Sequence, residues 1–410
     1  MRRFLKILLV ALFIFSRFPA LVFADYRLYD AIEEFGEHRY VKPETPANLK
    51  AGPVRIHPSL RTRAAYDSNI LFEDEDARED VVFNVKPGAI LELPIDKHQI
   101  AVGYEADFEN FVKKRDHSQN DQNQSFFALA DFRFPSFYIN ALDKLEATSS
   151  RAGTTFTSRI PRIDHTINPK VGYHWKRLTF ETGYNNFIRN FRHQGNEIFD
   201  FKVNEWNAVI FYDLFARLKA LMEYQLGKIS YDNNESRDGL VNQFRLGLEG
   251  EIIPHLVLKA RGGMQFRNYY YSSETDFNSW VASLSAEYAI RSNIRLKADL
   301  SREPLEANFQ EVNFYIRHSV GLGIEYDIHP RWTVFGGAKY FKDFYRERAT
   351  VQNMTGFRRD KHVGLNTGLR YNPREWWKME LAYEFLHRTS NFPGQDYNEN
   401  LVYISSAFVY

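Results

Sequence analysis

Apolar and polar residues alternate at every second position along most of the chain from about residue 56 onward. In the segment 256–267, for example, Leu258 and Phe266 share one parity while Lys259 and Arg267 share the other. A period of two places successive side chains on opposite faces of a β-strand. The pattern therefore predicts an all-β chain whose strands each have one apolar and one polar face.

The connections between these segments alternate between short and long. Short turns are expected at Asp96-Lys97, Pro135-Ser136, Lys176-Arg177, Asp213-Leu214, Pro254-His255, Ser292-Asn293, His329-Pro330 and Pro373-Arg374. Longer polar loops are expected at 112–124, 190–204, 230–239, 269–278, 343–358 and 388–399. Short periplasmic turns with longer extracellular loops are typical of transmembrane β-barrels. Segments of roughly 12 residues also exceed the usual soluble strand and suffice to cross a bilayer.

The fold class predicted is a transmembrane antiparallel up-and-down β-barrel formed by residues 54–410. Eight short turns imply eight hairpins and one strand at each end, or about 18 strands, with both termini in the periplasm. A count of about 16 remains possible, because the segment 137–148 has the weakest pattern.

The N-terminal residues lack the strand pattern. Residues 1–24 have a basic start, an apolar run and a small residue, Ala24, at the expected cleavage position, and so predict a secretory signal peptide. An uncleaved membrane anchor is the alternative. Residues 25–53 are expected to form a periplasmic leader, with a plug folded into the lumen as the alternative.

Composition supports a membrane location. Aromatic residues make up 16% of the chain, and the six tryptophans lie near expected strand ends, as in the aromatic girdles at membrane interfaces. The chain has no cysteine for disulfides. Its net charge is +1, and since residues 1–24 carry four basic and no acidic residues, the remainder carries −3. This balance argues against nucleic-acid binding.

The bacterial outer membrane is therefore the expected location, with its lipid and lipopolysaccharide as partners. The chain ends in a strand whose last residue is the aromatic Tyr410. Such an ending is similar to the C-terminal signal that the barrel-assembly machinery reads. That machinery is the second expected partner.

Known catalytic motifs are absent from the sequence, and the histidines show no metal-binding spacing. We therefore expect neither enzymatic activity nor a cofactor, and a membrane-embedded hydrolase or acyltransferase is the alternative. The acidic loop 73–80 is read as a solvated loop, with divalent-cation binding as the alternative.

The polar faces supply the candidate site. Alternation places one set of acidic residues and one set of basic residues in the lumen, on opposite walls of an 18-strand barrel. The candidate pore-lining residues are Glu105, Asp107, Glu109, Arg245, Lys259, Arg261, Arg267, Arg295 and Lys297. Opposed walls of this kind could create a transverse field, whereas the alternative is ion pairing along each wall.

The start of the barrel resembles the outer-membrane β-barrel porin family associated with exopolysaccharide loci. The resemblance rests on Tyr66-Asp67-Ser68-Asn69-Ile70, Pro87-Gly88 with Leu91 and Leu93, Gly103-Tyr104-Glu105, Arg162, Asn168, Gly172 and Tyr173. It covers about the first 130 residues of the barrel and implies permeation or polysaccharide export.

The function expected is a passive channel for small polar solutes. The alternatives are an exopolysaccharide export conduit, in which a polysaccharide is a further partner, and a structural barrel with a filled lumen. Bulky inward residues such as Phe211, Phe335 and Tyr403 favour the alternative in which side chains fill the lumen.

Overall fold

A computed structural model describes residues 49–113, 119–149, 159–192, 195–271, 276–309, 312–351 and 354–410. The signal peptide and most of the leader predicted from sequence lie outside these residues. The short strand β1 (Leu49–Ala51) precedes the remaining strands. These are β2 (Val54–Asp67), β3 (Asp80–Ile95), β4 (His98–Phe111), β5 (Gln119–Arg133), β6 (Phe137–Thr148), β7 (Arg162–Trp175), β8 (Leu178–Phe191), β9 (Phe201–Phe215), β10 (Leu218–Tyr231), β11 (Gly239–Ile253), β12 (Leu256–Tyr269), β13 (Phe277–Arg291), β14 (Ile294–Phe309), β15 (Val312–His329), β16 (Trp332–Val351), β17 (Met354–Arg374), β18 (Trp377–Ser390) and β19 (Tyr397–Val409).

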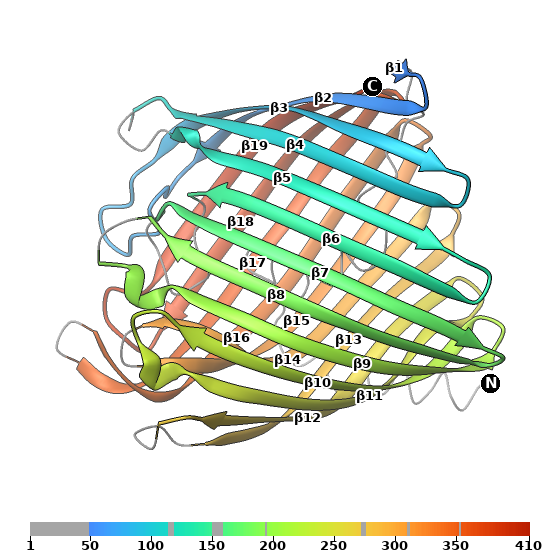
Figure 1. Ribbon diagram of the computed structural model, residues 1–410. Helices are drawn as coiled ribbons and strands as arrows, with labels where there is room; N and C mark the ends of the chain where they lie inside the picture. Colours follow the sequence, from blue (N-terminus) through green and yellow to red (C-terminus); the bar gives the residue numbers. More distant parts are fainter. Residues whose placement is uncertain are drawn as a thin grey trace.

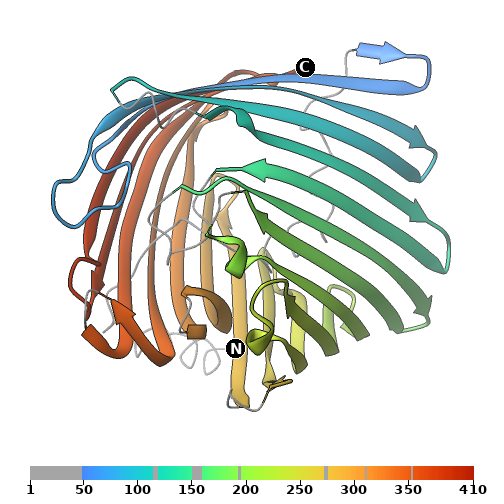
Figure 2. The same cartoon turned by 60° about the vertical axis from the view of Figure 1, so that its left-hand side comes forward.

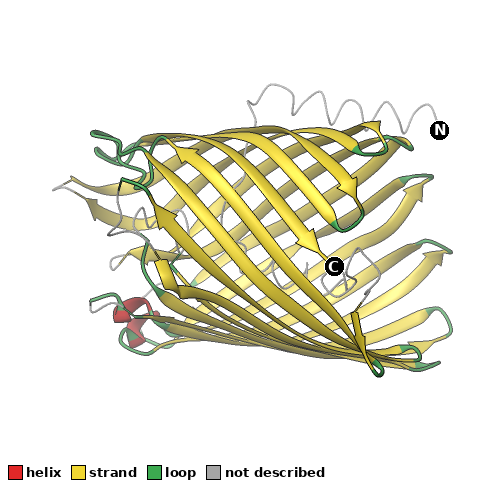
Figure 3. Cartoon of the chain, turned by 90° about the horizontal axis from the view of Figure 1, so that it is seen from above, coloured by secondary structure: helices red, strands yellow, loops and turns green. Residues whose placement is uncertain are grey.

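Strands β2–β19 pair with their neighbours in chain order, all antiparallel, and close into a barrel (Figures 1 and 3). Closure is made by β19 against β2, in a register that runs from Leu401 opposite Asp67 to Val409 opposite Ser59. The predicted 18-strand antiparallel barrel is thus confirmed, and the doubtful segment 137–148 is strand β6.

Two single-turn 3-10 helices, η2 (Glu197–Phe199) and η3 (Glu235–Arg237), lie in the connections at the long-loop end. Within the described ranges, no helix is both long and apolar enough to cross a membrane.

The barrel is apolar outside and polar inside. Outward side chains such as Leu246 and Ile404 are 55% and 51% exposed, whereas the inward Gln265 and Arg267 are 6% and 5% exposed. A continuous apolar outer surface of this extent is incompatible with water and is what lipid requires. Backbone groups in lipid must also be hydrogen-bonded internally, and the closed ladder satisfies them.

Several predicted connections differ from the structure. The expected loop 343–358 is mostly strand, because β16 continues to Val351 and β17 begins at Met354. The part of a strand that extends beyond the lipid needs no apolar face. The sequence of these extensions of β16 and β17 is therefore polar and resembles that of a loop. The turns predicted at Asp213-Leu214, His329-Pro330 and Pro373-Arg374 fall one to three residues later.

Two glycines allow aromatic rings to lie flat on the inner wall. A Cβ atom at Gly103 would lie 2.1 Å from the ring of Phe127, and one at Gly172 would lie 2.1 Å from the ring of Tyr138. Each aromatic residue is on the neighbouring strand and covers the glycine backbone, an arrangement that stabilises glycine-containing sheets.

Both ends of the described barrel lie on the side of the short turns. The start of β2 pairs with the end of β3, where Arg55 is opposite Glu92, and the end of β19 pairs with the same part of β2. Figure 1 shows β1 and the C-terminus at this end.

Leu284 and Ser285 are neighbours at the middle of β13 that face lipid and lumen respectively. We expect Leu284→Arg to lower the free energy of unfolding by about 2–4 kcal/mol, because it places a charge at mid-bilayer depth. The matched Ser285→Arg, opposite Asp299, should change it by less than about 1 kcal/mol. Urea unfolding in lipid vesicles measures both, and equal losses would contradict the assigned faces.

Candidate functional site in the barrel lumen

The three acidic candidates lie side by side on the inner face of β4 and are each paired with a base. Arg61 Nη1 lies 2.5 Å from Glu105 Oε2, and Lys86 Nζ lies 2.8 Å from Asp107 Oδ2. Glu109 accepts a hydrogen bond from Arg159, in the segment preceding β7. The predicted acidic wall is therefore neutralised by its neighbours.

The basic candidates of β11 and β12 are paired in the same way. Arg245 Nη2 lies 2.8 Å from Glu223 Oε1 on β10. Arg261 reaches both Glu223 (3.5 Å from Nε to Oε2) and Glu249 (3.3 Å from Nη2 to Oε2). Lys259 is opposite Glu249 in the strand register.

The basic candidates of β14 interact with carboxylates of β15. Arg295 Nε lies 3.1 Å from Glu325 Oε2, and its Nη1 lies 3.0 Å from Asp327 Oδ2. Lys297 is bound more loosely, with Nζ 3.6 Å from Glu325 Oε1, and its side chain is 46% exposed.

These contacts favour ion pairing over a transverse field between opposed walls. Opposite charges within about 4 Å cancel at distances beyond the Debye length, which is about 8 Å in physiological salt. The lumen instead presents a sequence of local pairs, of which Arg61–Glu105 and Lys297–Glu325 are the most exposed and Arg267–Glu306, near the loop end, is among the least exposed.

The loop ends of β14 and β15 fold into the lumen. In β15, all six residues Val312–Arg317 are buried, whereas a wall strand normally alternates. Glu306 of β14 accepts a hydrogen bond from Tyr231 of β10 at 2.9 Å and pairs with Arg267 of β12. These partners lie on inner walls two and four strands away. The described residues 305–309 and 312–316, here called the inward hairpin, thus lie against the inner surface near the loop end of the barrel, the end that comes forward in Figure 2.

A buried arginine anchors this inward hairpin. Arg237, at the end of η3, donates from Nη2 to the backbone oxygens of Ala307 (2.6 Å) and Asn313 (2.8 Å). It is 3% exposed, and its guanidinium carbon lies over the Tyr231 ring, 4.4 Å from the ring centroid. The adjacent Asp238 accepts the Tyr231 backbone N–H, and burial raises the pKa of its carboxyl.

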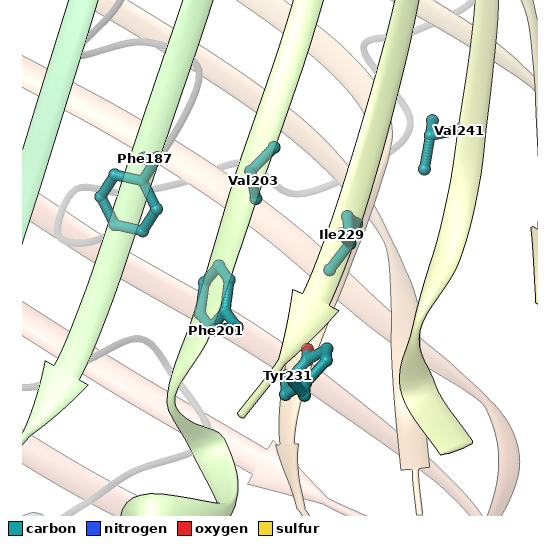
Figure 4. Packing of buried hydrophobic residues seen from close by; sticks show 6 residues of the cluster. All are labelled: Phe187, Phe201, Val203, Ile229, Tyr231 and Val241. Atoms are coloured by element: carbon teal, nitrogen blue, oxygen red, sulfur yellow. The ribbon is translucent and has the colours of Figure 1, made fainter. Parts of the chain in front are cut away.

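Apolar residues pack inside the loop end of the lumen, where water would otherwise be expected. Figure 4 shows one such cluster on β8–β11. Its members are Phe187, Phe201, Val203, Ile229, Tyr231 and Val241. A second cluster joins the inward hairpin to β16 through Val312, Tyr315 and Tyr345. The loop end of the lumen is therefore packed, and the turn end carries the exposed charges.

Charged residues of β15–β18 form a buried network beside the inward hairpin. Arg317 binds Asp343 through two hydrogen bonds of 2.8 and 2.7 Å. Arg358 binds Asp360 at 2.7 Å, and the Asp360 carboxylate also accepts a hydrogen bond from Ser390. Paired charges of this kind are costly to separate when buried. The network therefore holds together the loop ends of β15–β18, against which the inward hairpin packs.

The bulky inward residues that suggested filling lie against cations of the wall. Arg63 lies 4.1 Å from the ring centroid of Tyr403, Arg370 lies 5.1 Å from that of Phe335, and Lys219 lies 5.8 Å from that of Phe211. In these pairs the cation lies over the ring face. This geometry gives no specific support to a filled lumen.

Sequence analysis missed the inward hairpin and its anchor, Arg237. The one signal available was the loss of alternation after Glu303, where Pro304 interrupts the pattern. Among the described residues, no group of three or more acidic or histidine side chains could hold a metal ion.

Comparison with protein-family models gives no match, and comparison with curated protein sequences gives none either. Solved structures do match over most of their length. OccK1 (OpdK) of Pseudomonas aeruginosa has a TM-score of 0.50 at 10% identity, covering 87% of this chain and 99% of that one. OpdO of the same species has a TM-score of 0.50 at 12% identity, covering 86% and 97%.

A BenF-like porin from Pseudomonas fluorescens also matches, with a TM-score of 0.50 at 10% identity over 88% and 99% of the two chains. The protein is therefore a transmembrane β-barrel with the fold of bacterial outer-membrane porins. The association with exopolysaccharide loci receives no support from these matches.

We expect Arg237→Ala to free the inward hairpin, because it removes two hydrogen bonds from a charged donor to the hairpin backbone. Such bonds contribute about 1.5–3 kcal/mol each. Amide hydrogen exchange within 305–316 should then become at least about tenfold faster. The control is Arg217→Ala, an exposed ion-pair residue at the β9–β10 turn, which should leave it unchanged. Unchanged exchange in Arg237→Ala would refute the anchoring role.

Proposed function

We propose that this protein is a passive outer-membrane channel for small polar solutes. The observation that carries the proposal is the lumen itself, which is lined by charged side chains that remain partly open to solvent at the turn end. Lys297 and Arg295, near the turn end, have side chains that are 46% and 32% exposed, and Glu105, at the middle of β4, is 28% exposed. An 18-strand barrel is wide enough for an aqueous path.

The nine candidate residues take three roles in this proposal. Arg295, Lys297 and Lys259, which lie within four residues of the short turns, meet the solute in the wider, turn-side part of the pore. Arg267 and Glu109 hold the narrow part, since Arg267 fixes the inward hairpin and Glu109 binds Arg159. The remaining Glu105, Asp107, Arg245 and Arg261 form the wall between them.

Alternating local ion pairs suit neutral or zwitterionic polar solutes, because passing charges find a partner of either sign. A charge-selective pore would instead need a wall of one sign. The narrowing by the inward hairpin favours small solutes over a polymer, so export of an exopolysaccharide is the weaker proposal. A deletion strain with an unchanged secreted polymer would remove that alternative.

An enzymatic role finds no support in the porin folds or in the rim chemistry. His387, at the loop end of β18, has its Nδ1 2.6 Å from the amide oxygen of Asn398, which is not a catalytic partner. We also propose that both ends of the barrel face the periplasm and that the strand ending at Tyr410 is recognised during assembly.

Single-channel recording of the refolded protein in a planar bilayer tests the proposal. We expect steady ionic conductance, and we expect Lys297→Glu to raise the cation-to-anion permeability ratio by about two- to fivefold. Reversing one charge changes the energy of an ion passing about 8 Å away by roughly 1 kcal/mol in water, and salt screening lowers this figure.

The matched control is Lys202→Glu on β9, whose side chain is on the outer face, opposite Ser230 and Ile188. It should leave the selectivity unchanged. Absence of current from a folded protein would overturn the channel proposal. Normal current with unaltered selectivity in Lys297→Glu would remove only Lys297 from the pore lining.

A further inference from the structure

Six basic residues form a continuous row on the outer, lipid-facing surface of β14–β17. They are Arg302, His318, Lys342, Arg346, Arg359 and Lys361. In the strand register Arg302 is opposite His318, His318 is opposite Lys342, and Lys342 is opposite Lys361. Directly opposed residues have Cβ atoms about 4.5–5.5 Å apart, so the charges are neighbours.

The row lies immediately beyond an uncharged belt. From the turn end of β16, the outward positions before Lys342 are Trp332, Val334, Gly336, Ala338 and Tyr340. Ten residues of a strand tilted by about 40° rise about 25 Å, which is the height of the apolar band of such barrels. Trp280, an exposed tryptophan at the loop end of β13, lies at the same level.

No protein carboxylate neutralises this row within the described residues. The acidic residues of the same strands, such as Glu303, Asp343 and Asp360, occupy the opposite, lumen-facing parity. None of the six bases forms an ion pair with another described residue. Lys342 and Lys361 are like charges placed directly opposite each other, an arrangement that destabilises a sheet and whose cost a bound anion would remove.

One member of the row is held in place before any ligand arrives. Arg302 Nη1 donates to Ser279 Oγ at 2.6 Å and to the Trp280 backbone oxygen, and its guanidinium lies 4.1 Å from the Trp280 ring centroid. Its side chain is only 9% exposed, yet its Nε has no hydrogen-bond partner. His318 lies within the field of Arg302, Lys342 and Arg346.

We propose that this basic row binds the phosphate groups of a phosphorylated glycolipid in the outer leaflet of the outer membrane. The row is on the lipid side, at headgroup depth and on the loop side of the barrel, which is the extracellular side when the short turns are periplasmic. Basic residues near a membrane surface attract anionic headgroups with about 1 kcal/mol each. The acyl chains would lie along the uncharged belt of β14–β17 below.

The remaining outer wall offers a matched control. On β9 and β10, Lys202 and Lys228 are outward basic residues near the loop end, and Lys228 is 5.6 Å from the ring centroid of Tyr270. They lie four or more strands from the nearest member of the row, so they form a separate pair of basic residues. The double variant Lys202→Gln/Lys228→Gln removes outward charge without touching the row.

The test is native mass spectrometry of the full mature protein in zwitterionic detergent with added bisphosphorylated lipid A. The variant is Lys342→Gln/Arg346→Gln/Lys361→Gln, which keeps Arg302 and its contacts with Trp280. We expect the triple variant to bind the lipid at least about tenfold more weakly than the wild type. The Lys202→Gln/Lys228→Gln control should bind it like the wild type.

Two further arms identify the ligand chemistry. Dephosphorylated lipid A should bind the wild type as weakly as the intact lipid binds the triple variant. Inorganic phosphate should compete only weakly; if it binds the wild type as tightly as lipid A does, the row serves a soluble anion and the lipid assignment is overturned. Equal binding of both lipid forms, or equal binding by wild type and triple variant, would also overturn it.

The unfolding midpoint and the single-channel conductance are measured on the same protein samples as lipid binding. The triple variant should keep the unfolding midpoint and the single-channel conductance of the wild type, because its substitutions are outside the lumen. A misfolded variant is replaced by Lys361→Gln alone, for which a measurable loss of lipid affinity is still expected and unchanged affinity counts against the proposal. The inference does not depend on the proposed channel activity.

Discussion

Closure of the backbone hydrogen-bond ladder is the constraint on which the rest of the structure depends. In lipid each unpaired peptide group costs several kcal/mol, so the pairing of β19 with β2 leaves no open edge among the eighteen strands. Because strand side chains alternate, closure also fixes every residue to one of two surroundings. An apolar outer face and a charged inner face then follow from a single register.

The charged side chains on the inner surface form ion pairs with nearby side chains of opposite charge. Carboxylates and bases meet within 3.6 Å along both walls that carry the candidate residues. Pairing lowers the net field across the lumen but leaves a gradient of exposure from the turn end to the loop end. The inward hairpin accounts for this gradient, since its contacts with Arg237 and Tyr231 hold it against the inner wall where the apolar clusters pack.

The outer surface shows the opposite behaviour at one place. Among the described residues of β14–β17, the carboxylates lie on the other face from the row that runs from Arg302 to Lys361. Inside the barrel a similar density of arginines, such as Arg317 and Arg358, is matched by Asp343 and Asp360. The contrast, together with the depth of the row in the membrane, supports the proposal that these outer charges bind a lipid headgroup.

The sequence by itself determined the membrane barrel, its strand number and the face on which each candidate residue lies, because all three follow from period-two alternation and turn spacing. Residues such as Arg261 could be assigned to the inner face without knowing their partners. The inward hairpin and the extension of β16 and β17 into an expected loop were decided only by the tertiary structure. There the partners are distant in sequence: Tyr231 and Glu306 are 75 residues apart, and Arg237 binds backbone atoms, which no side-chain pattern records. Local periodicity specifies a face, but contacts across the lumen depend on how the closed wall brings strands together.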